Sequence, residues 1–200
     1  MAVFAVLPTV IILAMGHGGG GRPIRLDLST AQLVGNRQAP VQLVIFSDYQ
    51  CGFCRQLVPV LQQIRLKFPD DVLIAHRDYP LKGHPRAVPA AIAAYCAGQQ
   101  GAFWEYHDRL YVEGQDLGDS RLLEIATQLR FDLPRFSECL KSDSARQAVQ
   151  QSREDAEALG LEGVPIVFLN GRRVEGALNL PNLESRIKAL LTGVPKPPEQ

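Results

Sequence analysis

The feature that most constrains this chain is a Cys-Gly-Phe-Cys run at residues 51–54, placed between two apolar patterns. Residues 41–46, Val-Gln-Leu-Val-Ile-Phe, have the composition of a buried strand. From position 57 to position 68, large apolar side chains recur every three or four residues, which is typical of a helix packed on one face. The sequence therefore predicts a strand that delivers a CxxC pair to the N-terminus of a helix.

This placement favours redox chemistry at the pair. Unsatisfied backbone N–H groups and the helix dipole stabilise a thiolate at the helix N-terminus, so Cys51 is the candidate nucleophile and Cys54, one turn later, the candidate resolving thiol. The alternatives are half of a zinc site or two inert buried cysteines. A zinc half-site needs a second pair of ligands. The other cysteines, Cys96 and Cys139, are far apart in the sequence, and no HxxxH spacing occurs. No metal site is therefore expected.

Four stretches extend this pattern over most of the chain beyond residue 25: residues 35–55, 93–97 (Ala-Ala-Tyr-Cys-Ala), 100–108 (Gln-Gly-Ala-Phe-Trp-Glu-Tyr-His-Asp) and 163–168 (Gly-Val-Pro-Ile-Val-Phe). Together they resemble the DsbA-like branch of the thioredoxin superfamily. The resemblance implies an α/β architecture, a thioredoxin fold with a helical domain inserted at about residues 84–160. It implies an enzyme, a protein thiol–disulfide oxidoreductase that needs no cofactor.

The resemblance also assigns roles outside the cysteines. Val164 and Pro165 match the family's cis-proline loop, whose backbone pairs with an extended substrate, although an ordinary trans proline opening a strand is the alternative. Gly52 and Phe53 are the redox-tuning positions. The most strongly oxidising members have a histidine where Phe53 stands, so a milder oxidant with a less depressed thiol pKa is expected here.

One departure from the family concerns the proton of the resolving thiol. The family commonly places a glutamate on the central strand where this chain has Ile45. Asp48 is a substitute acid, but its position favours a role in the turn before the helix. The departure puts the rate of the resolving step in question and leaves the identity of Cys54 unchanged.

The expected activity is oxidation of cysteine pairs in extracytoplasmic proteins. A disulfide reductase with the same site, a non-redox binding module and a glutathione-using relative of the fold are the alternatives, because the direction of exchange depends on partner and compartment. The partners implied are thiol-containing protein substrates and a membrane redox partner that recycles the site. Lysine plus arginine and aspartate plus glutamate balance at 21 each, which removes any electrostatic argument for nucleic acid.

Other residues, most of them in the insertion, have simpler interpretations. Cys96 and Cys139 fall on two expected helices and form either a structural disulfide, which export favours, or two buried thiols. Three histidines lack a paired ligand spacing and are assigned to packing or to the surface: His76, His84 and His107. Three aromatic residues are assigned to the core of the insertion: Phe103, Trp104 and Tyr106.

The N-terminal segment indicates export. Residues 2–15 are mostly apolar but fall short of the about 20 residues needed to span a bilayer. Their length suits a signal peptide, with small residues Ala14 and Gly16 at the cleavage positions. No lysine or arginine precedes them, so an uncleaved anchor or a buried helix are alternatives. We expect residues 1–21 to be this leader and a Gly-rich tether, 22–194 the domain and 195–200 a tail.

The remaining strands follow from local signals. Residues 24–26 and 72–76 are strand candidates. Strands at 166–169 and 172–175 flank Asn170-Gly171, the strongest short hairpin signal because both central residues need positive φ. Pro59 lies inside the helix that follows the cysteines and should kink it, and Pro181 opens a final helix.

Overall fold

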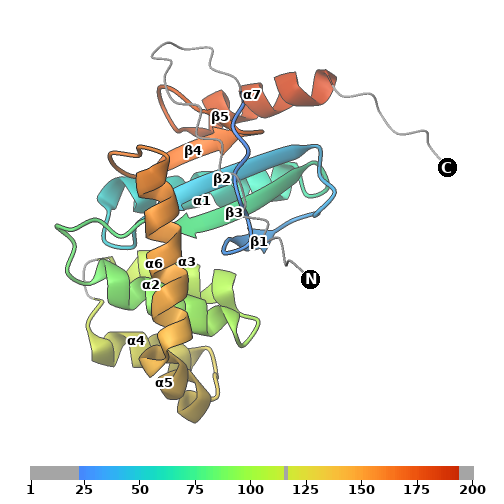
Figure 1. Ribbon diagram of the computed structural model, residues 1–200. Coiled ribbons are helices and arrows are strands. Elements are labelled where there is room, and N and C mark those ends of the chain that lie inside the picture. Colours follow the sequence, from blue (N-terminus) through green and yellow to red (C-terminus); the bar gives the residue numbers. More distant parts are fainter. Residues whose placement is uncertain (1–22, 115–116, 194–200) are drawn as a thin grey trace, which may run out of the picture.

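A computed structural model describes residues 23–114 and 117–193 of the 200-residue chain. The expected leader at residues 1–21 and the tail at 195–200 therefore lie outside the described residues. The described residues form a sheet flanked by helices and, next to it, a cluster of helices (Figure 1). In the sequence this cluster is inserted between the third and fourth strands. This is the α/β thioredoxin-type arrangement expected from the sequence. None of the described helices combines the length and the apolar character needed to cross a membrane.

The sheet is built around β2 and β3, which pair in parallel along their whole length. The order of the strands is β1-β3-β2-β4-β5, and the other neighbouring pairs are antiparallel. Because β2 is covered on both faces, it is almost continuously buried, which explains its nearly uninterrupted apolar sequence. The strands are β1 Gln32–Val34, β2 Val41–Ser47, β3 Val72–Asp78, β4 Ile166–Leu169 and β5 Arg172–Arg173.

Alternate residues of β2 belong to two separate cores. Leu43 and Ile45 pack with α1 (Gly52–Lys67) and α7 (Leu180–Thr192). Val44 and Phe46 face the opposite side, where they share a core with Ala156 of α6 (Asp143–Ala158). Figure 1 shows α6 running from the helical cluster back across the sheet. The buried Arg77 of β3 stabilises this contact, since its guanidinium group donates hydrogen bonds to the side chains of Ser152 and Asp155 on α6.

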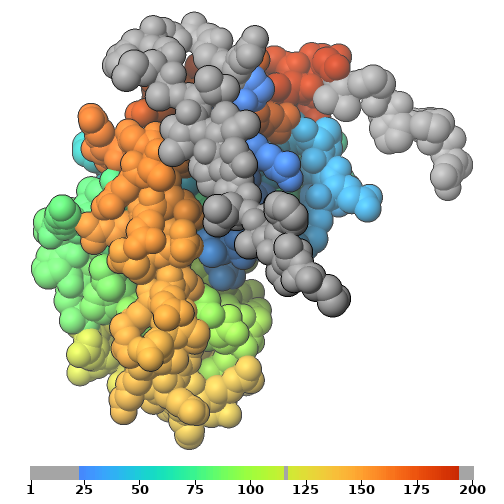
Figure 2. All heavy atoms as spheres, viewed as in Figure 1, coloured from blue at the N-terminus to red at the C-terminus, as the bar shows by residue number. Residues whose placement is uncertain are grey.

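The inserted helices have a third core, centred on the alanine-rich α2. Its small side chains let the neighbouring helices approach closely, and the large aromatic residues of α3 fill the space between them. The space-filling view shows this helical part as the lower half of the molecule (Figure 2). The inserted helices are α2 Ala87–Gly98, α3 Phe103–Glu113, α4 Asp119–Gln128, α5 Leu133–Lys141 and α6 Asp143–Ala158.

The hairpin prediction is confirmed, because β4 and β5 pair across Asn170 and Gly171, both with positive φ (45° and 74°). The strand predicted at residues 24–26 is wrong. Ile24 donates one backbone hydrogen bond to the Gly171 carbonyl but joins no ladder, and the edge strand is β1 instead. At three residues, β1 is too short to leave a periodic signal in the sequence.

Candidate active site

Cys51 lies in the connection between β2 and α1. β2 ends at Ser47, a short turn follows, and Cys51 occupies the N-cap of α1 with extended backbone angles. Its own N–H donates to the Asp48 carbonyl at 3.1 Å, which closes the turn. The Cys51 side chain keeps a little surface, 8% exposed, whereas Cys54 is 1% exposed. Neither is disulfide-bonded, so the structure shows the dithiol.

The pKa values of the two thiols are shifted in opposite directions. A hydrogen bond from the Cys54 thiol, helped by the backbone N–H groups of Phe53 and Cys54, lowers the pKa of Cys51 to about 6 against the effect of burial. Burial, and next the hydrogen bond to Cys51, raises the pKa of Cys54 far above its usual range. At neutral pH the site therefore pairs a Cys51 thiolate with a Cys54 thiol.

A loop distant in sequence closes over this pair. The Val164–Pro165 peptide bond is cis, the isomer that the resemblance implied. The Cys51 sulfur lies 3.6 Å from the Val164 carbonyl oxygen, although 113 positions separate the two residues. The loop thus places backbone groups beside the Cys51 thiol.

An open groove continues from the cysteines along α1. Phe53, between the two cysteines, has a ring that is 72% exposed. The groove has a volume of about 390 Å³ and is mainly apolar. Phe53 and Pro165 were assigned to the site from sequence, and the rest of the lining was missed. Part of it comes from α1 itself, and Leu178 and Asn179 come from the segment that leads into α7. The lining residues are Phe53, Gln56, Leu57, Val60, Pro165, Leu178 and Asn179.

Asp48 organises the turn before Cys51. Its buried carboxylate accepts hydrogen bonds from the backbone N–H groups of Gln50 (2.7 Å) and Leu81 (2.8 Å). It also lies 2.8 Å from Nδ1 of His84, which sequence reasoning had assigned only to packing or to the surface. These contacts agree with the turn role favoured for Asp48, and its negative charge raises the pKa of Cys51 slightly.

Two hydroxyl groups beside Cys54 were also missed. Ser47, the last residue of β2, is 2% exposed and its Oγ lies 2.6 Å from the hydroxyl of Tyr111 on α3. The Ser47 hydroxyl and the Asp48 backbone N–H lower the pKa of Cys54, but burial outweighs them and raises it. Ser47 stands only four residues before Cys51, so its position in the sequence was a signal that could have been used, whereas nothing in the sequence pointed to Tyr111.

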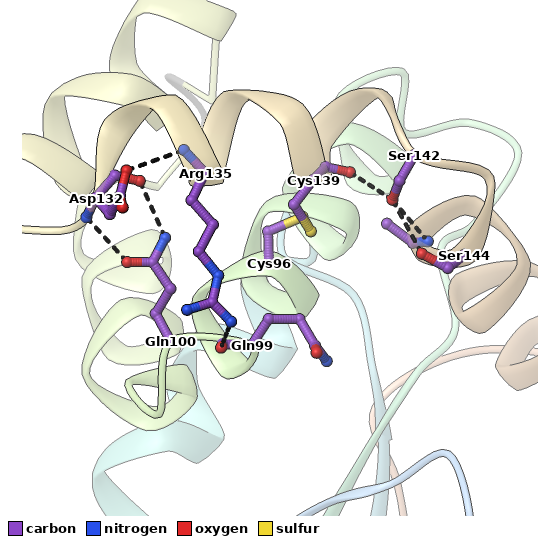
Figure 3. The surroundings of a disulfide bond; sticks show 9 residues. Cys96, Gln99, Gln100, Asp132, Arg135, Cys139, Ser142 and Ser144 are labelled. Atoms are coloured by element: carbon purple, nitrogen blue, oxygen red, sulfur yellow. Dashed lines mark hydrogen bonds between the residues drawn. A yellow bond between two sulfur atoms is a disulfide. The ribbon is translucent and has the colours of Figure 1, made fainter.

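Cys96 and Cys139 are joined by a disulfide that links α2 to α5. Figure 3 shows the polar contacts around it. On one side Gln100 exchanges hydrogen bonds with the backbone of Asp132, and Arg135 donates to the Gln99 carbonyl. The bridge is therefore part of a wider junction between the two helices.

The aromatic residues of α3 lie inside the molecule. Phe103 and Tyr106 are buried in the core of the insertion, as expected, and Trp104 donates its indole N–H to the Leu33 carbonyl. His76 and His107 pack together with ring centroids 4.9 Å apart. Burial lowers the pKa of His107 to about 4. Across residues 23–114 and 117–193, no three His, Cys, Asp or Glu side chains are grouped to hold a metal ion.

The sequence model of a family described as thioredoxin matches residues 28–189. The chain belongs to the thioredoxin family. Among solved structures, a thioredoxin-like oxidoreductase from Silicibacter pomeroyi DSS-3 is 25% identical with a TM-score of 0.74, and the match covers 82% of this chain and 94% of that one. BdbD from Bacillus subtilis is 19% identical with a TM-score of 0.77, covering 86% and 97%. The thiol–disulfide exchange protein alpha-DsbA2 from Wolbachia pipientis is 23% identical, with a TM-score of 0.74 over 81% and 88%. The DsbA-like form of the thioredoxin fold is thereby confirmed.

The curated relatives of this chain are named as Na(+)/H(+) antiporters. A Na(+)/H(+) antiporter NhaA 1 of Salinispora arenicola is 34% identical over 183 residues, 91% of this chain and 28% of that protein. A protein of the same name from Mycolicibacterium gilvum is 34% identical over 175 residues, 86% of this chain and 28% of that protein. The chain thus spans just over a quarter of the length of these relatives, and the name describes antiport by the longer proteins.

Proposed function

We propose that this protein is exported and oxidises cysteine pairs in extracytoplasmic proteins through a Cys51–Cys54 disulfide. One observation carries the proposal: a thiolate at the start of α1, with a pKa of about 6, lies beside a buried thiol and against the cis Val164–Pro165 loop. Cys51 forms the mixed disulfide with the substrate. Cys54 is released as a thiol in that step, and in the reverse direction it resolves the mixed disulfide. Gly52 and Phe53 tune the pair.

The acidity of Cys51 favours oxidation over reduction. A low thiol pKa stabilises the dithiol form, which makes the disulfide form more ready to accept electrons. A substrate thiolate attacks the Cys51–Cys54 disulfide at Cys51, and a second substrate thiol then displaces Cys51. The protein is left reduced and the substrate oxidised, so a redox partner at the membrane must take the electrons away.

The surroundings of Cys51 suit an extended peptide as substrate. The backbone beside Pro165 offers groups for pairing with a strand-like segment, and the apolar groove next to Phe53 offers a place for its side chains. A segment of an unfolded protein around a cysteine has both features. We therefore assign Val164 and Pro165 to substrate binding.

The disulfide between Cys96 and Cys139 supports an extracytoplasmic location. Disulfides persist in oxidising compartments and are rare where glutathione and thioredoxin keep thiols reduced. The same reasoning supports the oxidising direction, since the substrates in such a compartment need disulfides.

Trapping experiments in cells test the assigned roles. Cys54→Ala should accumulate mixed disulfides with substrate proteins at Cys51, because attack still occurs and resolution does not. Cys51→Ala should accumulate none. Replacing both Cys96 and Cys139 with alanine is a matched control for the loss of cysteines away from the site, because it leaves no unpaired thiol there. If non-reducing gels of the Cys51→Ala and Cys54→Ala proteins look alike, the roles are wrong.

Titration with dithiothreitol separates the alternatives. A binding module would show no exchangeable disulfide between Cys51 and Cys54. A glutathione-using relative would form its trapped adduct with glutathione in place of proteins. The proposal expects an exchangeable pair and protein adducts.

A further inference from the structure

Arg55 is an exposed cation in the first turn of α1, directly after the redox pair. Its backbone N–H donates to the Cys51 carbonyl at 3.1 Å, so the helix begins at the nucleophile and carries Arg55 one turn further on. Among the residues that the structure describes, its guanidinium group has no hydrogen-bond or ion-pair partner. An unpaired positive charge therefore stands at the surface next to Cys51 and Cys54.

The end of α3 holds this charge in place. Gly114 follows Glu113, the last residue of α3, and has a φ of 70°. A Cβ atom on Gly114 would lie 2.5 Å from Nη1 of Arg55, so the absence of a side chain there lets the guanidinium group lie against the backbone. The C-terminal end of a helix carries partial negative charge, which favours a cation at this point. The end of α3 thus positions Arg55 without neutralising it.

The acidic residues of the surrounding elements are committed or stand elsewhere. Glu113 pairs with Arg121 of α4, whose Nε donates to its carboxylate at 2.8 Å. The Asp48 carboxylate, in the turn before α1, is buried and already accepts hydrogen bonds from neighbouring groups. The one acid of the cis-proline loop, Glu162, belongs to a different element from α1 and α3. No residue that lines the apolar groove is charged, so Arg55 is the uncompensated charge on the α1 side of the site.

We propose that Arg55 selects substrate segments that carry an acidic side chain close to the cysteine that attacks the disulfide. This inference rests on thiol–disulfide exchange at Cys51 and Cys54, the function proposed above, and names a substrate class for that site. An extended segment advances about 3.3 Å per residue, so a carboxylate two residues from the attacking cysteine lies within reach of a long side chain one helical turn from Cys51. The planar guanidinium group suits such a carboxylate, because it donates two parallel hydrogen bonds to it.

The exchange that Arg55 serves runs in the oxidising direction. The first substrate thiolate attacks the Cys51 sulfur, the Cys51–Cys54 bond breaks, and Cys54 leaves and takes up a proton. The second substrate thiolate attacks the substrate sulfur of the mixed disulfide, and Cys51 leaves as a thiolate. The substrate loses two electrons and gains a disulfide, while the protein pair gains the two electrons. Of the two protons from the substrate thiols, one ends on Cys54 and one in the solvent, and Arg55 neither gives nor takes a proton.

Two series of two-cysteine peptides test the selection by the oxidised full chain. In one series the residue two positions before both cysteines is aspartate, asparagine or lysine, and in the other it is the residue two positions after them. Aspartate also alters the peptide thiols, so each second-order oxidation rate is divided by that of Arg55→Gln with the same peptide. In at least one series this ratio should be about two to five for aspartate, the value of an exposed ion pair, near one for asparagine and below one for lysine. Arg55→Glu should reverse the order, and high salt should shrink it.

Arg65→Gln is the matched control, because it removes the same charge from α1 about 15 Å further along the axis, where Arg65 lies over the Trp104 ring. It should leave the order of the peptides as in wild type. Reduction of the oxidised protein by dithiothreitol, which is uncharged, should be equally fast in wild type and Arg55→Gln. Equal ratios for aspartate and asparagine in both series, or a dithiothreitol rate that falls as far as the aspartate rate, would overturn this inference alone. If wild type oxidises none of the peptides, the proposed function fails and this inference fails with it.

Discussion

Phe53 is the side chain that distinguishes this site most clearly at the scale of single residues. Its exposed ring offers no hydrogen-bond donor to the Cys51 thiolate, whereas a histidine there does. A charge-assisted hydrogen bond is worth about 1.5–3 kcal/mol, or about 30–65 mV for a two-electron couple. Phe53→His should therefore raise the reduction potential by a few tens of millivolts, about this range, and lower the Cys51 pKa below its wild-type value.

Equilibration with glutathione buffers measures the potential of Phe53→His, and thiolate absorbance against pH measures the pKa of Cys51. Phe53→Leu is the control, because it changes the size of the side chain without adding a donor and should move neither value. A Phe53→His protein that became more reducing, or whose Cys51 pKa rose, would contradict this account of how the dipeptide tunes the site.

At the scale of elements, α3 carries a pH-sensitive contribution to stability. Burial lowers the pKa of His107 in the folded state to about 4, below the unfolded value of about 6.5. The unfolded chain thus binds more protons between these two values, so stability is fully present above about pH 6.5 and is lost as the pH falls toward 4. The expected loss from pH 7 to pH 4 is on the order of 3 kcal/mol.

Urea unfolding at the two pH values measures this loss. His107→Phe keeps an aromatic ring in the cluster and removes the titrating group, so its stability should fall less over the same range. Titrating groups that do not contact His107 remain in both proteins and cancel in the comparison. The pKa of Asp108 is lowered partly by its hydrogen bond to His107, so the difference between the two proteins reports the His107–Asp108 pair together. An equal loss in wild type and His107→Phe would show that His107 is not responsible.

The disulfide between α2 and α5 should stabilise the fold without affecting thiol–disulfide exchange at Cys51 and Cys54. Its sequence separation of 43 residues closes a long loop in the unfolded chain, and such a bridge contributes about 2–4 kcal/mol. Replacing both Cys96 and Cys139 with alanine should lower the free energy of unfolding by about this amount. The rates of the two exchange steps at Cys51 and Cys54 should stay as in wild type, and a large change in either rate would contradict a structural role.

The elements also show what the sequence could and could not predict. The strand–CxxC–helix unit and the Asn170-Gly171 hairpin were predictable because each depends on neighbours in the chain. β1 was missed because three residues carry no periodicity, and its place is decided by pairing with β3. Tyr111 was missed for a related reason, since only the packing of the insertion against the turn after β2 brings it to Ser47.

At the scale of the whole molecule, the site lies where three distant parts of the chain meet. The sheet and α1 supply the cysteines, the loop before β4 supplies Val164 and Pro165, and the insertion supplies Tyr111. The chemistry therefore depends on the folded state as a unit. In turn, the redox state of Cys51 and Cys54 must affect the stability of the whole fold.

That dependence has a sign that follows from the Cys51 pKa. In the folded dithiol it is about 6, below the unfolded value of about 8.5. The reduced protein therefore gains stability as the pH rises from about 6 toward 8.5 and loses it as the pH falls through 6. The oxidised protein has no thiol to titrate at this pair, so this contribution is absent from it.

The last prediction compares the two redox forms by urea unfolding across this range. Between pH 6 and pH 8 the reduced form should gain about 1–2 kcal/mol relative to the oxidised form, a range that allows for solvent screening at the sulfur. In an oxidant the folded state favours the dithiol. We expect a potential between about −120 and −270 mV, milder than that of the strongest oxidant because Phe53 offers no donor. Cys51→Ser is the control, since it removes the titrating thiol and should remove the contribution of Cys51 to the pH dependence of the reduced form. A stability difference between the two wild-type forms that stayed constant over it would mean that the Cys51 thiolate does not bias the fold toward the dithiol, and the argument for an oxidising role would lose its thermodynamic basis.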